Sequence, residues 1–454
     1  MSDSSARSLE ADKWTRRSLG DICINGGGSI QTGPFGSQLH AEDYQEEGVP
    51  IITVEHLRDG CIAHQNLPLV GKSDFQRLRR YMLSAGDLVF SRVGSIDRCA
   101  YVSDSEDGWL FSGRCLRVRA GNGEADSRFL AYLLNSCGQR QWILNHSVGS
   151  TMACLNTAIL SAVPIELPPK SQQRMIAKIL TTLDNLIEKT EILIAKYQAI
   201  KQGMMHDLFT RGVDAHGHLR PPQSEASDLY KQSDLGWIPK EWDVAHLVSF
   251  ASDSQGAFVN GPFGSDLLTT ELTGEGVPVI YVRDIKPGQY ERVSTVHVTE
   301  QKANQLVVCN VFRNDVLIAK VGDPPCDAAP YLNSWRSIIT QDVIRIRVAK
   351  DVDSKFLSHL LNSPMGRNAI RHITIEGTRA RVSLTQLKTL ELPKPPLLEQ
   401  ESLAAKVESL LTQIRTETNS VAKYKEAKMG LMQDLLTGKV RVRVDESEEF
   451  TTHV

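Results

Sequence analysis

The sequence predicts an α+β fold of two mixed α/β, strand-rich globules, each followed by a long α-helix, with the two helices paired as an antiparallel coiled coil. Three observations predict this fold. The 454-residue chain repeats its first half in its second, each half changes once from a Gly- and Pro-bearing stretch to a heptad pattern, and the two heptad patterns match position for position. We therefore expect an internal pseudo-twofold repeat.

Short motifs establish the repeat. The motif Gly-Pro-Phe-Gly-Ser at 33–37 recurs 228 residues later at 261–265. The motif Leu-Leu-Asn-Ser at 133–136 recurs 227 residues later at 360–363. Because the offset is almost constant along the chain, each half is one structural unit, and the halves differ by a few small insertions or deletions.

The first part of each unit is a globule, which we assign to residues 13–168 and 237–394. Short apolar runs such as 49–54 and 87–90 lie between Gly- and Pro-bearing turns, which is typical of buried strands. Two further stretches have one apolar face and predict short helices. These stretches are Arg128–Asn135 and Lys355–Asn362.

The second part of each unit is a helical spacer, at 169–212 and 395–440. Each spacer follows a Pro-Pro pair and ends near a glycine, Gly212 or Gly438, as helices commonly do. Apolar residues spaced alternately four and three apart continue for more than four heptads, so a helix roughly 60 Å long must pack against a partner. The apolar seam consists of Ile176, Leu180, Leu183, Ile187, Ile194, Tyr197, Met204 and Leu208, and of Leu403, Val407, Leu410, Ile414, Val421, Tyr424, Leu431 and Leu435.

Two seam positions are polar in both copies. Thr190 matches Glu417, and Lys201 matches Lys428. We favour the interpretation that these residues are tolerated register markers near solvent. The alternative is that they face partner proteins.

The remaining segments are predicted tails at 1–12 and 441–454 and a polar, proline-bearing linker at 213–236. The polar start lacks a signal-peptide pattern, and no run of about eighteen apolar residues suggests a membrane span. Eight cysteines without a Cys-x-x-Cys pair favour a reducing, cytoplasmic setting and no metal site. The net charge of −3 means that nucleic-acid binding would depend on local basic patches.

Catalytic motifs are largely missing. The sequence has no P-loop, no His-Glu-x-x-His and no Gly-x-Ser-x-Gly. The stretch 323–326, Asp-Pro-Pro-Cys, resembles the Asp-Pro-Pro-Tyr of amino-methyltransferases but lacks the aromatic residue that stacks on a flipped base, so we expect a plain proline turn. Asp87 and Asp315 recur just before an apolar strand, where capping a turn is their expected role.

Binding signals are stronger. The Gly-Pro-Phe-Gly-Ser loop can bring backbone N–H groups close to a phosphate, or it can be a tight turn with Phe35 or Phe263 tucked into the core. Arginine is the commonest bidentate reader of guanine, so basic clusters are candidates for contacts with DNA. The candidate residues are Gly33, Phe35, Ser37, Arg58, Arg77, Arg79, Arg80, Arg92, Arg98, Ser150, Thr151, Gly261, Phe263, Ser265, Arg283, Lys286, Lys320, Thr378, Arg379 and Arg381.

A second set of arginines alternates along predicted strands and shares one strand face. This face is either a DNA footprint or simply solvated. The set consists of Arg114, Arg117 and Arg119. Further basic candidates in the second half are Arg336, Arg345, Arg347 and Arg371.

The order of globule, long helix, globule and long helix resembles the specificity subunit of type I restriction-modification systems. The resemblance also includes the tryptophans that open each globule, Trp14 and Trp242, and the Gln173 and Gln400 that lead into helices ending in Met-x-Asp-Leu-x-Thr. It implies that each globule is a target recognition domain for one half of a bipartite site in double-stranded DNA. The helices would set the spacing of the half-sites and dock two modification (methyltransferase) subunits.

The resemblance further implies restriction (translocase/nuclease) subunits as partners. S-adenosylmethionine, ATP and Mg would serve those partner subunits, and this chain would have no cofactor, catalytic residue or metal of its own. Two other classes stay open. One is a coiled-coil scaffold with two protein-binding domains. The other is a single-chain DNA methyltransferase or nuclease, for which the sequence shows neither a cofactor site nor a metal carboxylate set.

Overall fold

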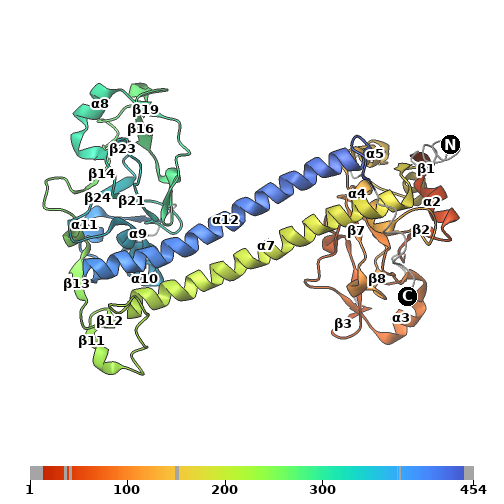
Figure 1. The fold of residues 1–454 in the computed structure, drawn as a ribbon, viewed down its shortest axis with the longest axis horizontal. Helices are drawn as coiled ribbons and strands as arrows, with labels where there is room; N and C mark the ends of the chain where they lie inside the picture. Colours follow the sequence, from red (N-terminus) through yellow and green to blue (C-terminus); the bar gives the residue numbers. More distant parts are fainter. Residues whose placement is uncertain are drawn as a thin grey trace, which may run out of the picture. The chain divides into compact units, whose positions relative to one another are not determined.

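The computed structural model describes residues 14–34, 38–39, 43–148, 153–375, 377 and 380–443. The chain divides into two compact units. Unit 1 contains the residues up to Thr190 and those from Asn419 onward, and unit 2 contains Glu191–Thr418. Each unit therefore has one globule and one stretch of each long helix, α7 (Lys170–Arg211) and α12 (Leu397–Leu435), as Figure 1 shows.

Unit 1 has a globule of two small sheets with short helices around them. In its described part, one four-stranded sheet has the antiparallel order β2 (Ser29–Thr32), β9 (Cys115–Arg119), β6 (Leu88–Ser91) and β7 (Cys99–Tyr101). The other has the order β3 (Tyr44–Gln45), β5 (Leu69–Val70), β4 (Val49–Ile52) and β8 (Leu110–Phe111), with β4 and β8 parallel. The helices are α2 (Leu19–Asn25), α3 (Lys72–Leu78), α4 (Ser127–Leu134), α5 (Cys137–His146) and α6 (Thr157–Ser161).

Unit 2 repeats this topology. One sheet has the order β14 (Phe258–Asn260), β24 (Val343–Arg347), β21 (Asp315–Ala319) and β22 (Ala328–Pro330). The other has the order β15 (Leu272–Thr273), β19 (His297–Val298), β16 (Val277–Ile280), β23 (Ser337–Ile339) and β20 (Asn310–Val311), with β16 and β23 parallel. Two short strand pairs are β17 (Ile285–Lys286) with β18 (Gln289–Tyr290) and β25 (Thr374–Ile375) with β26 (Arg381–Val382). The helices are α8 (Glu300–Gln305), α9 (Ser354–Asn362), α10 (Pro364–His372) and α11 (Leu384–Lys388).

The first and last strands of each globule pair with each other. Strand β1 (Thr15–Ser18) is antiparallel to β10 (Pro164–Leu167), and β13 (Asp243–His246) is antiparallel to β27 (Glu391–Lys394). This pairing places the start of each globule beside the start of the long helix that follows it. The predicted repeat, strand-rich globules and short helices are therefore confirmed.

A buried glutamine fixes the junction between each globule and its helix. The Gln173 amide donates to the carbonyl oxygens of Pro168 at 2.7 Å and Glu124 at 3.0 Å, and accepts from the Asp126 N–H at 2.7 Å. Gln400 makes the equivalent contacts in unit 2, with Pro395 at 2.8 Å and with residues 351 and 353 at 3.0 Å. Each side chain satisfies three buried backbone groups that would otherwise lack partners.

The long helices pack against each other within each unit. In unit 1, Ile176 and Leu180 of α7 share a core with Leu435 of α12. In unit 2, Leu208 of α7 shares a core with Leu403 and Val407 of α12. In each unit the earlier part of one helix meets the later part of the other, so the predicted antiparallel pairing is confirmed (Figure 1).

A glycine follows each long helix, and a tryptophan packs beside that glycine. Gly212 and Gly438 have φ of +65° and +70°, which suits glycine after a helix. A Cβ on Gly212 would lie 2.6 Å from Trp242 Cζ2, and one on Gly438 would lie 3.2 Å from Trp14 Cζ2. The tryptophan that opens each globule therefore packs over the end of the helix that belongs to the other repeat.

The polar seam residues do not all lie near solvent, as the favoured interpretation expected. Thr190 is buried and its hydroxyl donates to the Leu186 carbonyl oxygen at 2.7 Å. Lys428 Nζ pairs with Asp184 and lies 5.5 Å from the centre of the Tyr132 ring. The prediction of a marker near solvent is wrong for Thr190, which is 7% exposed, whereas the Lys428 side chain is 24% exposed. Lys201 is half-buried, and burial lowers its pKa.

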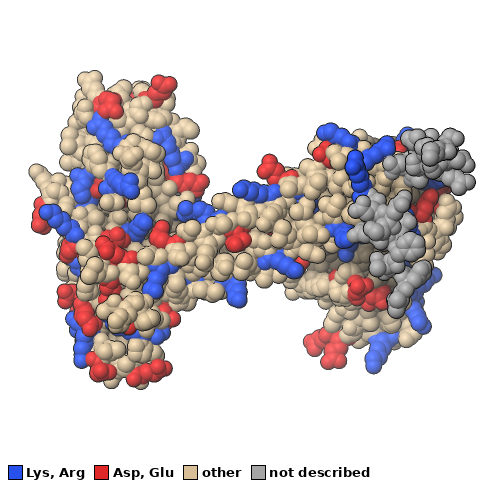
Figure 2. Space-filling model, in the orientation of Figure 1, with Lys and Arg blue, Asp and Glu red and all other residues tan. Residues whose placement is uncertain are grey.

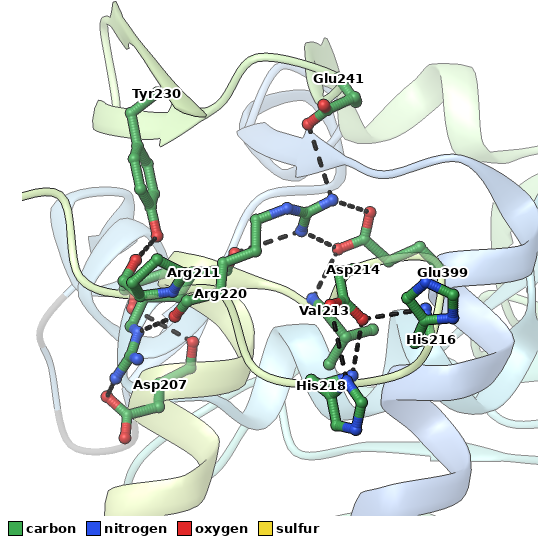
Figure 3. A network of polar contacts seen from close by, with 12 residues as sticks. Asp207, Arg211, Val213, Asp214, His216, His218, Arg220, Tyr230, Glu241 and Glu399 are labelled. Atoms are coloured by element: carbon green, nitrogen blue, oxygen red, sulfur yellow. Dashed lines mark hydrogen bonds and ion pairs between the residues drawn. The ribbon is translucent and has the colours of Figure 1, made fainter. Parts of the chain in front are cut away.

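The segment predicted as a linker is partly folded. Its strand β11 (Tyr230–Ser233) pairs with β12 (Gly236–Pro239). Arg220 forms hydrogen bonds with Glu399 at 2.5 and 3.1 Å and lies 3.6 Å from Glu241 (Figure 3). Glu399 also accepts from the Val213 N–H at 2.9 Å. Composition suggested a linker because the segment is polar, but ion pairs distant in sequence hold it against the start of α12.

Within the described residues, no helix combines the length and apolarity that crossing a membrane requires.

Candidate nucleic-acid interface

A buried carboxylate supports the central sheet of each globule. Asp87 accepts from the Ser84 N–H at 2.8 Å, and Asp315 accepts from the Phe312 N–H at 2.9 Å. The predicted turn caps are therefore confirmed. Each carboxylate also binds an arginine on the neighbouring strand of its sheet, Arg119 of β9 or Arg347 of β24. The hydrogen bonds that Arg119 donates to Asp87 raise the pKa of Arg119 above its ordinary value.

Of the alternating arginines in unit 1, Arg117 and Arg119 bond to oxygen atoms of their own globule, whereas Arg114 is exposed. Arg117 and Arg345 are buried, with Arg345 only 1% exposed. Arg117 donates to the Met82 carbonyl oxygen at 3.1 Å, and Arg345 donates to the carbonyl oxygens of Gly256 and Val308 at 2.7 Å. Sequence alternation correctly placed Arg117 and Arg119 on one strand face, but it did not show that other residues cover Arg117.

The Gly-Pro-Phe-Gly-Ser motif contains a close backbone approach. A Cβ on Gly33 would lie 2.1 Å from the Ser112 carbonyl oxygen, and a Cβ on Gly261 would lie 2.1 Å from the Thr340 carbonyl oxygen. Only glycine fits these positions. Phe263 is 59% exposed, so the prediction that it is tucked into the core is wrong. Ser265 is also exposed.

A groove of about 1610 Å³ lies in unit 2 beside this motif. Thr340 lines it, next to Gly261, and so do Arg283 and Arg371. Three more sequence-predicted cations are chain neighbours of lining residues. Lys286 precedes Pro287, Lys320 precedes Val321, and Arg381 follows Ala380. Among the described basic candidates of unit 2, the structure therefore places Arg283 and Arg371 in the lining of one groove, and Lys286, Lys320 and Arg381 next to lining residues in sequence.

The proline turn at 323–326 lines the same groove, with a cis peptide bond between Asp323 and Pro324. A wall of the groove also includes Asn362, Arg367 and Asn368, at the end of α9 and on α10. Sequence reasoning named Arg371 from this wall but missed its neighbours. The signal that was available is the Asn-Ser step that precedes both α5 and α10.

The basic candidates of unit 1 lie near several elements. Arg77, Arg79 and Arg80 are exposed at the end of α3, where Arg77 also donates to Asp74 at 2.6 Å and Arg80 donates to the Tyr81 hydroxyl at 2.7 Å. Elsewhere in unit 1, Arg58 comes after β4, Arg92 follows β6 and Arg98 precedes β7. Arg58 and Arg98 are exposed, and Arg92 is half-buried.

Six sequence-predicted candidates lie outside the described residues. They are Phe35, Ser37, Ser150, Thr151, Thr378 and Arg379.

The charge distribution agrees with a near-neutral chain. On the face drawn in Figure 2, Lys and Arg side chains are interspersed with Asp and Glu.

Among the described residues, no group of three or more His, Cys, Asp or Glu side chains is arranged to hold a metal ion. Burial raises the pKa of the Cys23 thiol to about 11 and that of Cys115 to about 12, which suppresses the thiolate form that a nucleophile needs.

Comparison with known proteins decides the family. Residues 11–196 and 271–424 match the type I restriction modification DNA specificity domain, once in each half of the chain. The chain belongs to this family. The two specificity-domain matches include most of both globules and of the long helices, which is the repeat that the structure shows.

Relatives of the whole chain are specificity subunits. A putative type I restriction enzyme MjaX specificity subunit of Methanocaldococcus jannaschii is 26% identical over 406 residues, 87% of this chain and 88% of that protein. The EcoBI specificity subunit of Escherichia coli is 21% identical over 411 residues, 88% of this chain and 79% of that protein.

The solved S subunit of a type I restriction-modification system from M. genitalium has a TM-score of 0.57 at 15% identity, covering 93% of this chain and 96% of that one. A second structure, of the type I restriction-modification system, has a TM-score of 0.53 at 16% identity, covering 94% of this chain and 98% of that one. These similarities show the fold.

Proposed function

We propose that this chain is the DNA reader of a type I restriction-modification complex, in which each globule binds one half of a bipartite site in double-stranded DNA. The observation that carries the proposal is the duplicated scaffold. The two copies share the same buried networks, built on Asp87 and Asp315 and on Gln173 and Gln400. The exposed residues around them differ, as one scaffold with two targets requires.

The long helices provide the spacing and the docking surface in this proposal. Large apolar side chains are exposed on the helices within each unit, Leu186 and Met429 in unit 1 and Ile192 and Ile200 in unit 2. In the proposed complex, a partner protein would cover these side chains. We assign this contact to two modification (methyltransferase) subunits, with restriction (translocase/nuclease) subunits joining the complex.

The chemistry belongs to those partners in the proposed complex. S-adenosylmethionine, ATP and Mg would bind to the partner subunits, and this chain would contribute recognition. Partner subunits would also supply part of the phosphate clamp, which reconciles DNA binding with a net charge of −3.

An exchange of recognition domains tests the proposal. Residues 13–168 are replaced by the corresponding domain of another specificity subunit, and the chain is expressed with its modification subunits. Sequencing of methylated DNA should show one changed half-site and one unchanged half-site. A change in both halves, or methylation that ignores the exchange, would refute the assignment of one globule to one half-site.

A salt titration separates this function from a protein scaffold. The complex with modification subunits should bind a duplex that contains the methylated site, and its affinity should fall steeply as salt increases. A complex that ignores DNA at every salt concentration would favour the scaffold. Methyl transfer by the isolated chain would favour the single-chain enzyme.

A further inference from the structure

Helices α5 and α10 occupy the same place in the two units and are anchored in the same way. Asn135 precedes α5, and its side-chain amide donates to the Cys99 carbonyl oxygen at 2.7 Å. Asn362 precedes α10, and its amide donates to the Ala328 carbonyl oxygen at 2.7 Å. These contacts tie the start of each helix to an edge strand, β7 or β22, of the central sheet.

An arginine and an isoleucine then fix the rotation of each helix. Arg140 of α5 donates to Asn135 Oδ1 at 2.9 Å, and Arg367 of α10 donates to Asn362 Oδ1 at 2.7 Å. Ile143 is fully buried in unit 1, and Ile370 is 2% exposed in unit 2. Because the inner face of each helix is held at several points, its outer face is presented in a defined orientation.

The outer faces differ where the inner faces agree. On α10 the exposed residues include Asn368, Arg371 and His372. At the equivalent positions, α5 exposes Gln141, Leu144 and Asn145. An exposed polar face is normally only solvated, and solvation alone does not require a buried Asn–Arg–Ile anchor to be repeated beneath it.

These side chains are chemically suited to the edges of base pairs. Asn and Gln pair with adenine, Arg pairs with guanine, and an apolar side chain such as Leu contacts the thymine methyl group. An α-helix fits the major groove of B-DNA. Helices of ten and nine residues are about 15 Å long, which spans roughly four base pairs.

The groove of unit 2 provides a surface that complements this helix. Asn368 and Arg371 line the groove on one side, and Gln341, Asp342 and Arg283 line it elsewhere. Its volume of about 1610 Å³ exceeds the usual range for small-molecule pockets and suits an extended ligand. Arg371 also donates to Asn368 Oδ1 at 2.7 Å, which orients its guanidinium before any ligand binds.

We propose that α10 is the base-reading helix of unit 2 and α5 that of unit 1, each inserted into the major groove of its half-site. This inference rests on the proposed function and adds which residues select the bases. Asn368 and Arg371 would select bases in one half-site. Gln141 and Asn145, whose side chains are joined by a 2.8 Å hydrogen bond, would select bases in the other.

The test uses the full chain in complex with its modification subunits. Methylation motifs are sequenced for Asn368→Ala, Arg371→Ala and the pair Gln141→Ala with Asn145→Ala, with Gln305→Ala on the exposed surface of α8 as a control. The unit 2 variants should relax one half-site only, with about 10-fold or greater loss of discrimination at one or two base pairs. The unit 1 variant should relax the other half-site, and the control should leave the motif unchanged.

Two other outcomes would overturn the inference. An unchanged motif in all variants would overturn the inference. A uniform loss of affinity with a smaller salt dependence and an unchanged motif would make these residues phosphate contacts and would also overturn it. If the point variants leave the motif unchanged while the exchange of residues 13–168 still switches one half-site in the same host, the proposed function stands and this inference fails. Thermal unfolding of each purified complex excludes loss of folding as the cause.

Discussion

Arg119 and Asp87 form a two-point ion pair in unit 1, with Arg119 Nε 2.7 Å from one carboxylate oxygen and Nη2 2.6 Å from the other. Arg347 and Asp315 form the same pair in unit 2, with both distances at 3.2 Å. The aspartate is almost fully buried in both units. Each pair joins β6 to β9 or β21 to β24, and each aspartate also caps the turn before its strand.

Removal of this charge should destabilise unit 1. Asp87→Asn keeps the side-chain shape but leaves the Arg119 guanidinium without its counter-charge, so we expect a loss of about 2–4 kcal/mol in the free energy of unfolding. Chemical denaturation measures the change. Asp74→Asn, which removes the exposed ion pair with Arg77, is the control and should cost less than about 1 kcal/mol. Equal effects of the two substitutions would contradict the structural role of Asp87.

The junction glutamines should behave as a matched pair. Gln173→Ala leaves three backbone groups without a partner, and we expect a loss of about 2–4 kcal/mol, with a similar loss for Gln400→Ala. Gln173→Glu retains an acceptor for the Asp126 N–H but cannot donate to two carbonyl oxygens, so it should also destabilise the protein. Gln202→Ala, at an exposed position on α7, should leave the unfolding midpoint unchanged.

Two glycines in one motif allow a direct test of the close backbone approach. Gly261→Ala forces a methyl group to 2.1 Å from the Thr340 carbonyl oxygen, so the backbone must move and the protein should lose more than about 2 kcal/mol. Gly264→Ala has no atom within 4 Å of the new methyl group and should be close to neutral. A melting temperature that falls equally for both variants would mean that motif flexibility, rather than packing, explains the glycines.

The contact between His359 and Glu408 predicts a dependence of stability on pH. His359 Nε2 lies 2.7 Å from Glu408 Oε1, and this hydrogen bond lowers the pKa of Glu408 below its ordinary value of 4.5. Because the unfolded chain binds the proton more tightly, the stabilisation is present above the unfolded pKa and is lost as pH falls through the lower, folded pKa. Glu408→Gln should therefore flatten the stability curve between about pH 5 and pH 3, by roughly 1 kcal/mol.

The control for this prediction is Glu401→Gln, which removes an exposed carboxylate from the same helix. Melting temperatures measured across the acidic range should keep the wild-type slope in this variant. If Glu408→Gln also keeps that slope, the hydrogen bond to His359 does not couple protonation to folding.

An insertion in the long helices tests their role in spacing. One heptad is added after Thr190 in α7 and one after Ser420 in α12, so that both apolar seams remain in phase. Seven residues add about 10 Å of helix, or about three base pairs of B-DNA. The methylated motif should keep both half-sites while the gap between them lengthens. A gap of the original length would mean that the helices do not set the spacing.

The sequence alone determined the features that depend on near neighbours along the chain. The repeated motifs predicted two copies of one unit, and the four-three spacing predicted which residues of α7 and α12 are apolar partners. Turn caps such as Asp87 were predictable because the acceptor and the Ser84 N–H lie three residues apart. The glycines that end the helices were predictable for the same reason.

Only the tertiary structure decided which predicted faces are covered. Alternation put Arg117 and Arg119 on one strand face, but their partners Met82 and Asp87 are more than thirty residues away and meet them only through sheet pairing. Phe263 is exposed, although its motif suggested burial. The groove of unit 2 gathers segments from 281 to 380. Covering a surface requires residues that are distant in sequence, and their arrangement depends on the packing of the whole unit.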